Sequence, residues 1–402
     1  MAARGRSVSV AAAVASPLQV AHIPQGPVVG TQILTPVQQW FFANQTEQPR
    51  HWNQSVLLDV REPLDLLRLQ TAVQQVLAQH DALRLQFREQ AGQWTARYVP
   101  LDSSAATDLL WTAQVHSSEA LQALCDEAQR SLSLHDGPLL RAVLIDHEQG
   151  AQRLLLVIHH LVVDGVSWRV LLEDLQAAYA GQALVEKTSA LQDWARQLSA
   201  YAQSPALMAE RDSWLQQLQD ASARLPHART EASQALRHRQ VVSLGLDRAQ
   251  TRHLLQQAPA AYRTQINDLL LTALARALCD WTGDATALIQ LEGHGREDLF
   301  AGIDLTRTVG WFTSLFPVKL TPAAGMAMCL ACWIRFAKSY PPFNARPSRF
   351  LRDSSRRVCS ARKRAWPTAK RFMHRAVNTR CQCNHCALRA TGDHAPGGRV
   401  PR

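Results

Sequence analysis

The stretch that decides the fold of this chain is His159-His160-Leu161-Val162-Val163-Asp164-Gly165. The residues before it, 154–158, are all aliphatic, a pattern typical of a fully buried strand. A helical pattern follows the stretch, and we expect Ser167 to cap a helix that ends at Tyr179 before Gly181. Polar side chains between a buried strand and a helix can face a cleft rather than the core. This loop is therefore the first candidate for a functional site.

The two histidines and the aspartate of the loop allow a metal site, a catalytic loop or a purely structural loop. Neighbouring His159 and His160 on an extended chain point to opposite faces, so they would not easily share one metal ion. We expect one histidine in an active cleft and Asp164 turned back to hold the loop, because a buried carboxylate needs a cationic or hydrogen-bonding partner. We expect Gly165 to permit a tight turn.

Strand and helix patterns alternate along the chain, which predicts an α/β fold. Regular structure is expected to begin at Thr35, a suitable N-cap, with Pro36 in the first helical position. Further helices are expected at residues 63–80, 190–202, 209–218 and 265–281. Strands are expected at residues 55–60, 83–87, 154–158, 240–246 and 287–291.

Charge divides the chain into two unequal parts. The formal net charge is +10, which on its own would indicate a nucleic-acid partner. Residues 323–402 carry 17 basic and 2 acidic side chains, however, whereas residues 1–322 carry 26 and 31. Cys125 and Cys279 are the only cysteines before residue 323, which predicts a reducing, cytoplasmic environment without disulfides.

Residues 1–28 read as an Ala-, Ser- and Pro-rich linker. Residues 13–15 resemble a signal-peptidase site, but the preceding run is only weakly hydrophobic, which favours the linker. The chain contains no run of 18 apolar residues, so no membrane-spanning helix is expected.

Four motifs in order resemble the condensation-domain superfamily of nonribosomal peptide synthetases. The loop matches the HHxxxDG signature of that superfamily, and three earlier segments resemble its first core motifs: residues 35–42 (TPVQQWFF), 51–55 (HWNQS) and 80–84 (HDALR). The resemblance implies two lobes like chloramphenicol acetyltransferase that form a V around a central tunnel. We expect the N-terminal lobe at residues 29–190 and an incomplete C-terminal lobe at residues 191–322.

Two further motifs resemble the epimerization branch of this superfamily. Residues 292–297 (EGHGRE) and 307–313 (RTVGWFT) match epimerization-domain motifs, and residues 162–169 read like the epimerization variant of the signature loop. The resemblance covers roughly residues 25–322. It implies conversion of an L to a D centre at the Cα of an aminoacyl or peptidyl thioester. Peptide-bond formation by a condensation domain, or a degenerate module that only docks a carrier protein, are the alternatives.

The resemblance assigns roles to individual residues. Glu292 matches the catalytic glutamate and is the candidate base, with a pKa that burial would raise. His160 matches the second histidine of the signature and would stabilise the enolate or deliver the proton. Asp164 is expected to pair with Arg296 and so to tie the two motif loops together. His159 is expected to be structural.

Other residues of these motifs are given supporting or neutral roles. His294 and Glu297 would support the site or belong only to its loop, and Trp40 and Trp311 are expected in the core or tunnel wall. No metal or cofactor is expected to bind directly. The substrate would be presented on the phosphopantetheine arm of a carrier protein, within a set of synthetase modules and without nucleic-acid or membrane partners.

The sequence after Pro322 departs from the family. Family members carry later GxGYG-like and FNYLG-like segments, and neither segment is present here. A frameshift near residues 321–324 is the expected explanation, and it would leave apolar faces uncovered and the product poorly soluble and inactive. A polycationic tail can bind nucleic acid non-specifically. A zinc site in the tail is a weaker alternative because the spacing of its candidate ligands is loose. Those candidates are Cys329, Cys332, Cys381, Cys383, His385 and Cys386.

Overall fold

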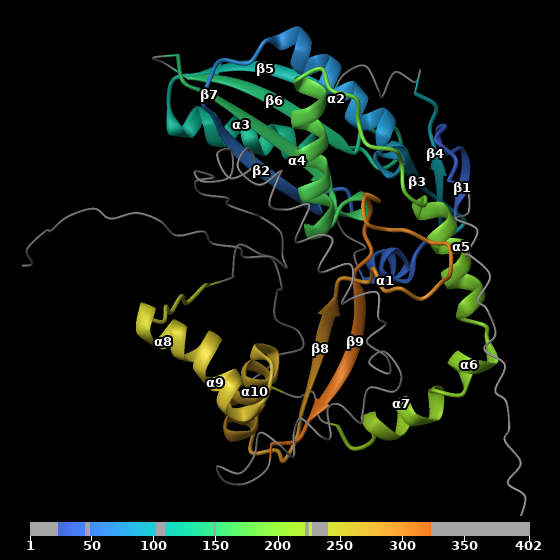
Figure 1. Cartoon of the computed structure of the whole chain (residues 1–402), viewed down its shortest axis with the longest axis vertical. Coiled ribbons are helices and arrows are strands. Elements are labelled where there is room, and N and C mark those ends of the chain that lie inside the picture. Colours follow the sequence, from blue (N-terminus) through green and yellow to red (C-terminus); the bar gives the residue numbers. More distant parts are fainter. Residues whose placement is uncertain are drawn as a thin grey trace, which may run out of the picture.

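The computed structural model describes residues 23–44, 49–101, 109–147, 150–221, 225–226 and 240–322. Below, the N-terminal region means residues 23–190 and the C-terminal region means residues 191–322. Figure 1 shows the N-terminal region in its upper half and β8, β9 and α10 of the C-terminal region in its lower half. Most of the expected linker, at residues 1–22, and the tail, with its zinc and nucleic-acid interpretations, lie outside the described residues.

Strands of the described residues form three sheets. The largest has the order β2-β7-β6-β5, with β5 and β6 parallel and the other pairs antiparallel. Its strands are β2 (Asn53–Val60), β7 (Gln152–His159), β6 (Leu140–His147) and β5 (Leu110–Val115). A three-stranded sheet has the order β1-β4-β3, and the C-terminal region holds the antiparallel pair β8-β9. These strands are β1 (Gly30–Gln32), β4 (Gln93–Tyr98), β3 (Leu85–Gln90), β8 (Ala287–Gly293) and β9 (Ser314–Leu320).

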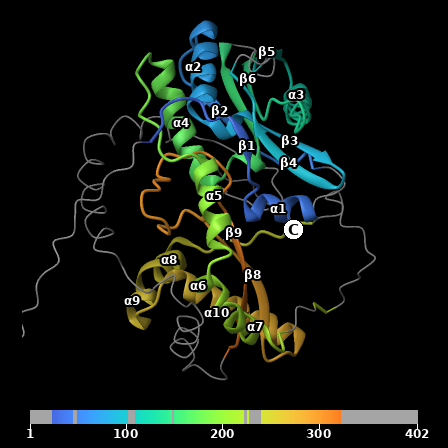
Figure 2. The ribbon, with the colours of Figure 1, turned by 90° about the vertical axis from the view of Figure 1, so that its right-hand side faces the viewer.

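Helices cover both faces of the four-stranded sheet. Figure 2 shows α2 (Leu66–Gln79) and α4 (Gly165–Tyr179) on one face and α3 (Ser118–Arg130) on the other. The N-terminal region also holds α1 (Pro36–Asn44) and the 3-10 turns η1 (Asp81–Arg84) and η4 (His160–Val162). The C-terminal region holds α5 (Leu191–Tyr201), α6 (Pro205–Met208), α7 (Arg211–Leu218), α8 (Arg248–Arg252), the π-helical turn η6 (His253–Gln257), α9 (Ala258–Tyr262) and α10 (Ile266–Thr282). Together these elements make the mixed α/β fold that the sequence predicts.

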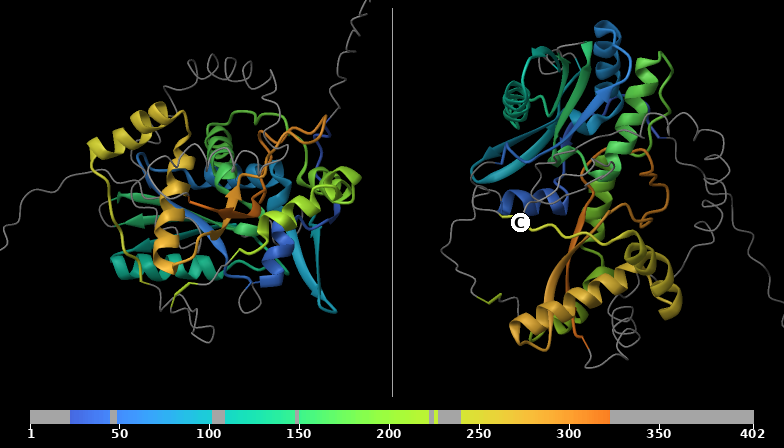
Figure 3. Two further views of the ribbon diagram at one scale, coloured as in Figure 1. Left: turned by 90° about the horizontal axis from the view of Figure 1, so that it is seen from below. Right: turned by 90° about the vertical axis from the view of Figure 1, so that its left-hand side faces the viewer.

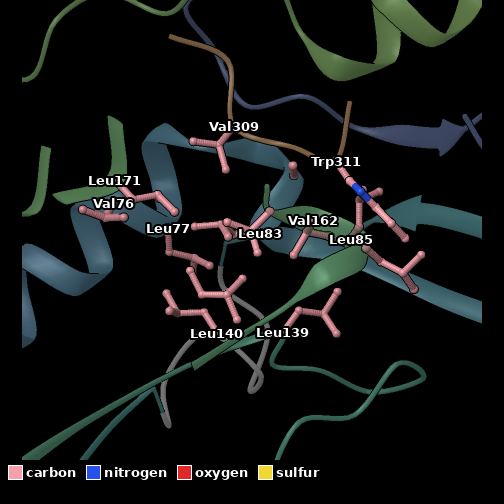
Figure 4. Packing of buried hydrophobic residues seen from close by; sticks show 14 of the residues in the cluster. Val76, Leu77, Leu83, Leu85, Leu139, Leu140, Val162, Leu171, Val309 and Trp311 are labelled. Atoms are coloured by element: carbon pink, nitrogen blue, oxygen red, sulfur yellow. The ribbon is translucent and has the colours of Figure 1, made fainter. Parts of the chain in front are cut away.

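The core follows from the alternation of side chains along the central strands. On β6, Ala142 and Leu144 join the cluster beneath α2 and α4, whereas Val143 and Ile145 join the cluster beneath α3. Figure 4 shows residues of the larger cluster, including Val309 and Trp311, which belong to the C-terminal region. A segment of the C-terminal region is therefore part of the N-terminal core.

The C-terminal region is built on two strands. Helix α10 packs against β8 and β9, and α7 packs against β9. Figure 3 shows α10 lying beside this pair, away from the four-stranded sheet. Strand β8 begins at Ala287 as predicted and continues to Gly293, so it contains the first residues of the EGHGRE motif. Within the described residues, no helix is both long enough and apolar enough to cross a membrane.

The structure corrects several expected boundaries near helix starts. The helix expected at 63–80 begins at Leu66, because Asp65 caps it by accepting from the Arg68 amide. The helix after the signature begins at Gly165, and its N-cap is Asp164 rather than Ser167. Before α1, the hydroxyl of Thr35 makes no capping bond. The side chain of Gln38 instead accepts from the Thr35 amide.

Two other elements expected from the sequence start later than predicted, and one expected strand is wrong. The strand expected at 83–87 starts at Leu85, after the turn η1. The helix expected at 209–218 is α7, which begins at Arg211, and the short helix α6 ends at Met208 before the expected start. The strand expected at 240–246 is wrong, because these residues form no regular structure and Leu244 is 96% exposed.

Candidate active site

His159 ends strand β7 and is fixed from both ring nitrogens. Its Nε2 lies 2.9 Å from the Pro49 carbonyl, and its Nδ1 accepts from the Leu161 amide at 3.2 Å. The ring is completely buried, and this burial lowers the pKa of His159 to about 3. A neutral ring with both nitrogens engaged shapes the loop and is not free for chemistry.

His160 opens the turn η4 and faces a different set of groups. Its amide donates to the Trp52 carbonyl at 2.8 Å, which anchors the turn beside β2. Its Nε2 lies 2.9 Å from Nε2 of Gln54 on β2. The ring of Trp311 lies against the imidazole, with centroids 4.2 Å apart. His160 is 7% exposed, so it lies at the edge of the core rather than deep within it.

Asp164 joins three segments of the chain. It caps α4 by accepting from the amide and hydroxyl of Ser167, at 2.8 and 2.7 Å. It accepts from the Phe312 amide at 3.2 Å and forms an ion pair with Arg296, whose Nη2 lies 3.0 and 3.1 Å from its two carboxylate oxygens. The ion pair expected between the two motif loops is therefore present.

Arg296 is buried and nearly all of its donors are used. Its side chain is 8% exposed, and Nη1 donates to the carbonyls of Leu305 and Thr308 at 3.0 and 2.6 Å. Nη2 also donates to the hydroxyl of Ser167, and the guanidinium lies 4.0 Å from the ring centroid of Phe312. Burial lowers the pKa of Arg296, and the charge of Asp164 opposes that shift. The pair thus holds residues 294–313, called here the motif strap, against the signature loop.

Glycines let the motif strap fold back on itself. Gly295 has a φ of +66°, in the left-handed region that favours glycine. A Cβ at this position would lie 1.6 Å from the Phe312 carbonyl oxygen, so two backbone segments touch here. At Gly310 the backbone amide donates to Ser167 at 3.1 Å, which ties the strap to the start of α4.

Glu292 lies on β8, where it pairs with Leu315 of β9. Its side chain is exposed, so the expectation that burial surrounds the candidate base is wrong for the chain as described. His294 and Glu297 lie further along the strap, with His294 Nε2 3.5 Å from Glu297 and its Nδ1 accepting from the Arg296 amide. The His294 side chain is 57% exposed, and its hydrogen bond to the Arg296 amide organises the local turn.

The expectation that Gly165 is needed for a tight turn is wrong. Its φ is not in the left-handed region, and nothing lies within 4 Å of the position where a Cβ would be. The turn therefore does not require glycine here. Gly165 is exposed at the first position of α4, next to open space beside the signature loop.

Four residues were not assigned to the site from the sequence, although one of them, Ser167, was expected as a helix cap: Gln54, Ser167, Trp168 and Thr308. Gln54 bridges His160 and Trp168, because Trp168 Nε1 donates to Gln54 Oε1 at 2.7 Å. Ser167 and the Thr308 carbonyl both bind Arg296. All four belong to motif segments quoted above, so the signal was present, but nothing in the sequence showed which member of each motif makes contacts.

The structure joins Asp164, Ser167 and Arg296 in one hydrogen-bonded cluster, places Trp311 against His160, and places Glu292 on the strand that leads into the motif strap. Among the described residues, no three His, Cys, Asp or Glu side chains are grouped as a metal site would need. The imidazole of His160 and the carboxylate of Glu292 are groups of the kind that move protons and polarise carbonyl groups.

Comparison with known proteins matches residues 28–331 to the model of the condensation domain. Tyrocidine synthase 2 of Brevibacillus parabrevis is 40% identical over 305 residues, which cover 74% of this chain and 8% of that protein, so this chain spans a small part of that relative's length. The crystal structure of the epimerization domain from the third module of tyrocidine synthetase B is 38% identical, with a TM-score of 0.70, over 78% of this chain and 73% of that domain. The first condensation domain of the calcium-dependent antibiotic synthetase, 22% identical with a TM-score of 0.61 over 77% of this chain and 75% of that one, shares the fold. This chain belongs to the condensation-domain family.

Proposed function

We propose that this chain epimerises the Cα of an aminoacyl or peptidyl thioester, from L to D, during nonribosomal peptide synthesis. The substrate is carried on the phosphopantetheine arm of a carrier protein, and other synthetase modules are the further partners. The similarity to the solved epimerization domain supports this assignment, as do the EGHGRE and RTVGWFT motifs at residues 292–297 and 307–313.

The observation that carries the proposal is the buried ion pair between Asp164 and Arg296. One member belongs to the signature loop and the other to the EGHGRE motif, so the pair joins the two segments that hold His160 and Glu292. Burying two charges is costly unless both are paired and hydrogen-bonded. Asp164 and Arg296 meet that condition through Ser167, Phe312 and two carbonyl groups.

The chemistry needs a base for the Cα proton, stabilisation of the enolate, and a proton donor on the opposite face. A thioester makes the Cα proton more acidic than an amide would. Glu292 is our candidate base, and its exposed carboxylate is open to a bound thioester. His160 is our candidate for stabilising the enolate and exchanging the second proton.

The test is uptake of solvent deuterium at Cα of an aminoacyl thioester on a carrier protein, read by intact mass. The proposal predicts uptake with the wild-type chain, against the inactivity expected from the departure after Pro322, and a loss of about 10²- to 10⁴-fold in Glu292→Gln, which removes one acid–base group. Asp298→Asn is the matched control, because Asp298 is an exposed carboxylate in the motif strap, close to Glu292 in the sequence. Equal uptake in wild type and Glu292→Gln would contradict the role of Glu292.

Carrier-protein docking without chemistry is a second candidate, and the exposure of Glu292 favours it. A docking module would bind the aminoacyl carrier protein equally well as wild type and as a His160→Ala, Glu292→Gln double variant, and neither would take up deuterium. Amide formation by a condensation domain is the third candidate, favoured by the family match. It would give a dipeptidyl thioester once a second aminoacyl carrier protein is added.

A further inference from the structure

Three side chains from three elements form a directed chain of hydrogen bonds that ends on His160. Trp168 of α4 donates from Nε1 to Oε1 of Gln54 at 2.7 Å. Nε2 of the same Gln54, on β2, lies 2.9 Å from Nε2 of His160 in η4. Gln54 is 5% exposed, so water does not readily compete for its amide.

The direction of this chain follows from the chemistry of its first member. An indole N–H donates and never accepts, so the atom of Gln54 that faces Trp168 must be the carbonyl oxygen. The NH₂ group of Gln54 then faces His160, and it can only donate. His160 Nε2 must therefore be the acceptor, which places the proton of the neutral ring on Nδ1.

We propose that Gln54, oriented by Trp168, is a positioning residue that holds His160 in the neutral tautomer protonated on Nδ1. A proton on Nε2 would place an N–H against the N–H of the amide, so the same contact disfavours the imidazolium ion. The proposal rests on the proposed function for its consequence. At rest His160 can accept a proton at Nε2, as it would in the reverse, D-to-L direction, where Glu292 returns the second proton. To deliver the second proton in the L-to-D direction, His160 must first be protonated at Nε2, which requires the Gln54 amide to move away.

Several groups near the ring are neutral or paired with each other. Trp311 packs on the ring from the motif strap and carries no charge. His159, the preceding residue, is held neutral by its burial. Asp164 of the loop and Arg296 of the strap, which are both buried, are paired with each other. Replacing the neutral amide of Gln54 by a carboxylate should therefore change the protonation of His160 Nε2 directly.

The test uses the full chain with ¹⁵N-labelled histidine and records the imidazole nitrogens by NMR, with the His160 signals assigned from their loss in His160→Ala. In wild type we expect Nε2 of His160 to be unprotonated and Nδ1 to carry the proton. In Gln54→Glu, one carboxylate oxygen still accepts from Trp168 and the other accepts from His160, so the tautomer should reverse. Trp168→Phe should give a mixture, because Gln54 is then free to turn over.

Enzyme kinetics provide a second readout that a merely structural role would not move. A carboxylate beside His160 favours the imidazolium, so the acidic limb of the pH profile for Cα deuterium uptake by the D-aminoacyl thioester, where His160 is the acceptor, should move up by about 1–3 pH units in Gln54→Glu. Gln74→Glu, at an exposed position of α2, adds the same charge elsewhere and should leave both readouts unchanged.

The outcomes separate this proposal from the proposed function. A wild-type ring protonated on Nε2 would overturn the proposal, even if no variant folds. A tautomer that is unchanged in a folded Gln54→Glu chain would overturn it as well. The expected tautomers without any deuterium uptake in wild type would support the role of Gln54 and contradict the epimerase assignment instead.

Discussion

The N-terminal and C-terminal regions bury their apolar residues to very different extents. Helix α2, with 14 residues, buries five of them against the four-stranded sheet. Helix α10 is longer, with 17 residues, yet only Ala275 is buried, and Leu270, Leu274 and Trp281 are 49%, 43% and 55% exposed. The two helices differ in burial because the sheets they pack against differ in size. The two strands β8 and β9 offer α10 much less apolar surface than the four-stranded sheet offers α2.

The motif strap belongs to the C-terminal region by sequence but to the N-terminal region by packing. Val309, Trp311 and Phe312 are 3–5% exposed and lie in the larger core cluster. Charged and polar contacts through Arg296 and Gly310 attach the same strap to α4. The candidate site is therefore stabilised by the well-packed region, and the predictions below probe this division.

Replacing Arg296 by Met should have the largest effect, because it leaves the Asp164 carboxylate buried without its ion-pair partner. We expect a loss of about 3–5 kcal/mol in the free energy of unfolding, measured by urea titration. Arg153→Met is the control. It removes an ion pair to Asp59 whose side chains are 36% and 46% exposed, and it should cost at most about 1 kcal/mol. Similar losses in both variants would mean that the strap is not held by this pair.

Shortening a leucine in each region should measure the difference in packing directly. Leu156→Ala in β7 creates a cavity at a residue that is 5% exposed, and we expect it to cost about 2–5 kcal/mol. Leu270→Ala on α10 removes a side chain that is already half exposed and should cost about 0.5 kcal/mol or less. A large cost for Leu270→Ala would show that another surface covers α10 in solution.

Adding a methyl group to Gly295 and to Gly165 should separate a position that needs glycine from one that does not. Gly295→Ala meets the Phe312 carbonyl and a left-handed φ, and we expect a loss of about 1–3 kcal/mol. Gly165→Ala points into open space and should change stability by less than about 0.5 kcal/mol. Thermal unfolding of both variants beside wild type is the measurement, and equal shifts would contradict the described strap.

Stability should fall in mild acid because of His159. Its pKa is about 3 in the folded chain and 6.5 for an unperturbed histidine, so the unfolded chain binds one more proton between these values. The contribution of the neutral ring is complete well above pH 6.5 and is lost as the pH falls towards 3, by about 1.4 kcal/mol per unit. His159→Gln should have a pH dependence shallower by one proton between pH 6.5 and 5. An unchanged slope would mean that His159 titrates normally.

Local patterns in the sequence predicted the elements whose signals are local. The aliphatic run at 154–158 became the centre of β7, and the periodic run at 265–281 became α10. The motifs predicted the pairing of Asp164 with Arg296, which are 132 residues apart. Residue types alone do not reveal such a pair, and the family pattern supplied it.

The errors arose where tertiary partners decide the outcome. The alternation of Val242, Leu244 and Leu246 is what a half-buried strand would show, but these residues pair with no strand among the described residues. Burial of Glu292 was expected from its role, whereas its exposure depends on what covers β8. The cap at Asp164 was missed because Ser167 is also a good cap, and the preference for one of them depends on Arg296 and Phe312.

The most direct test of the epimerase assignment is the stereochemistry of the product. A carrier protein loaded separately with the L and the D aminoacyl thioester is incubated with the chain, and the released amino acid is resolved on a chiral column. The account predicts that both starting forms approach the same mixture, and that Glu292→Gln does not convert either form while Asp298→Asn does. If each form keeps its configuration with a folded wild-type chain that binds the carrier protein, the epimerase assignment is contradicted.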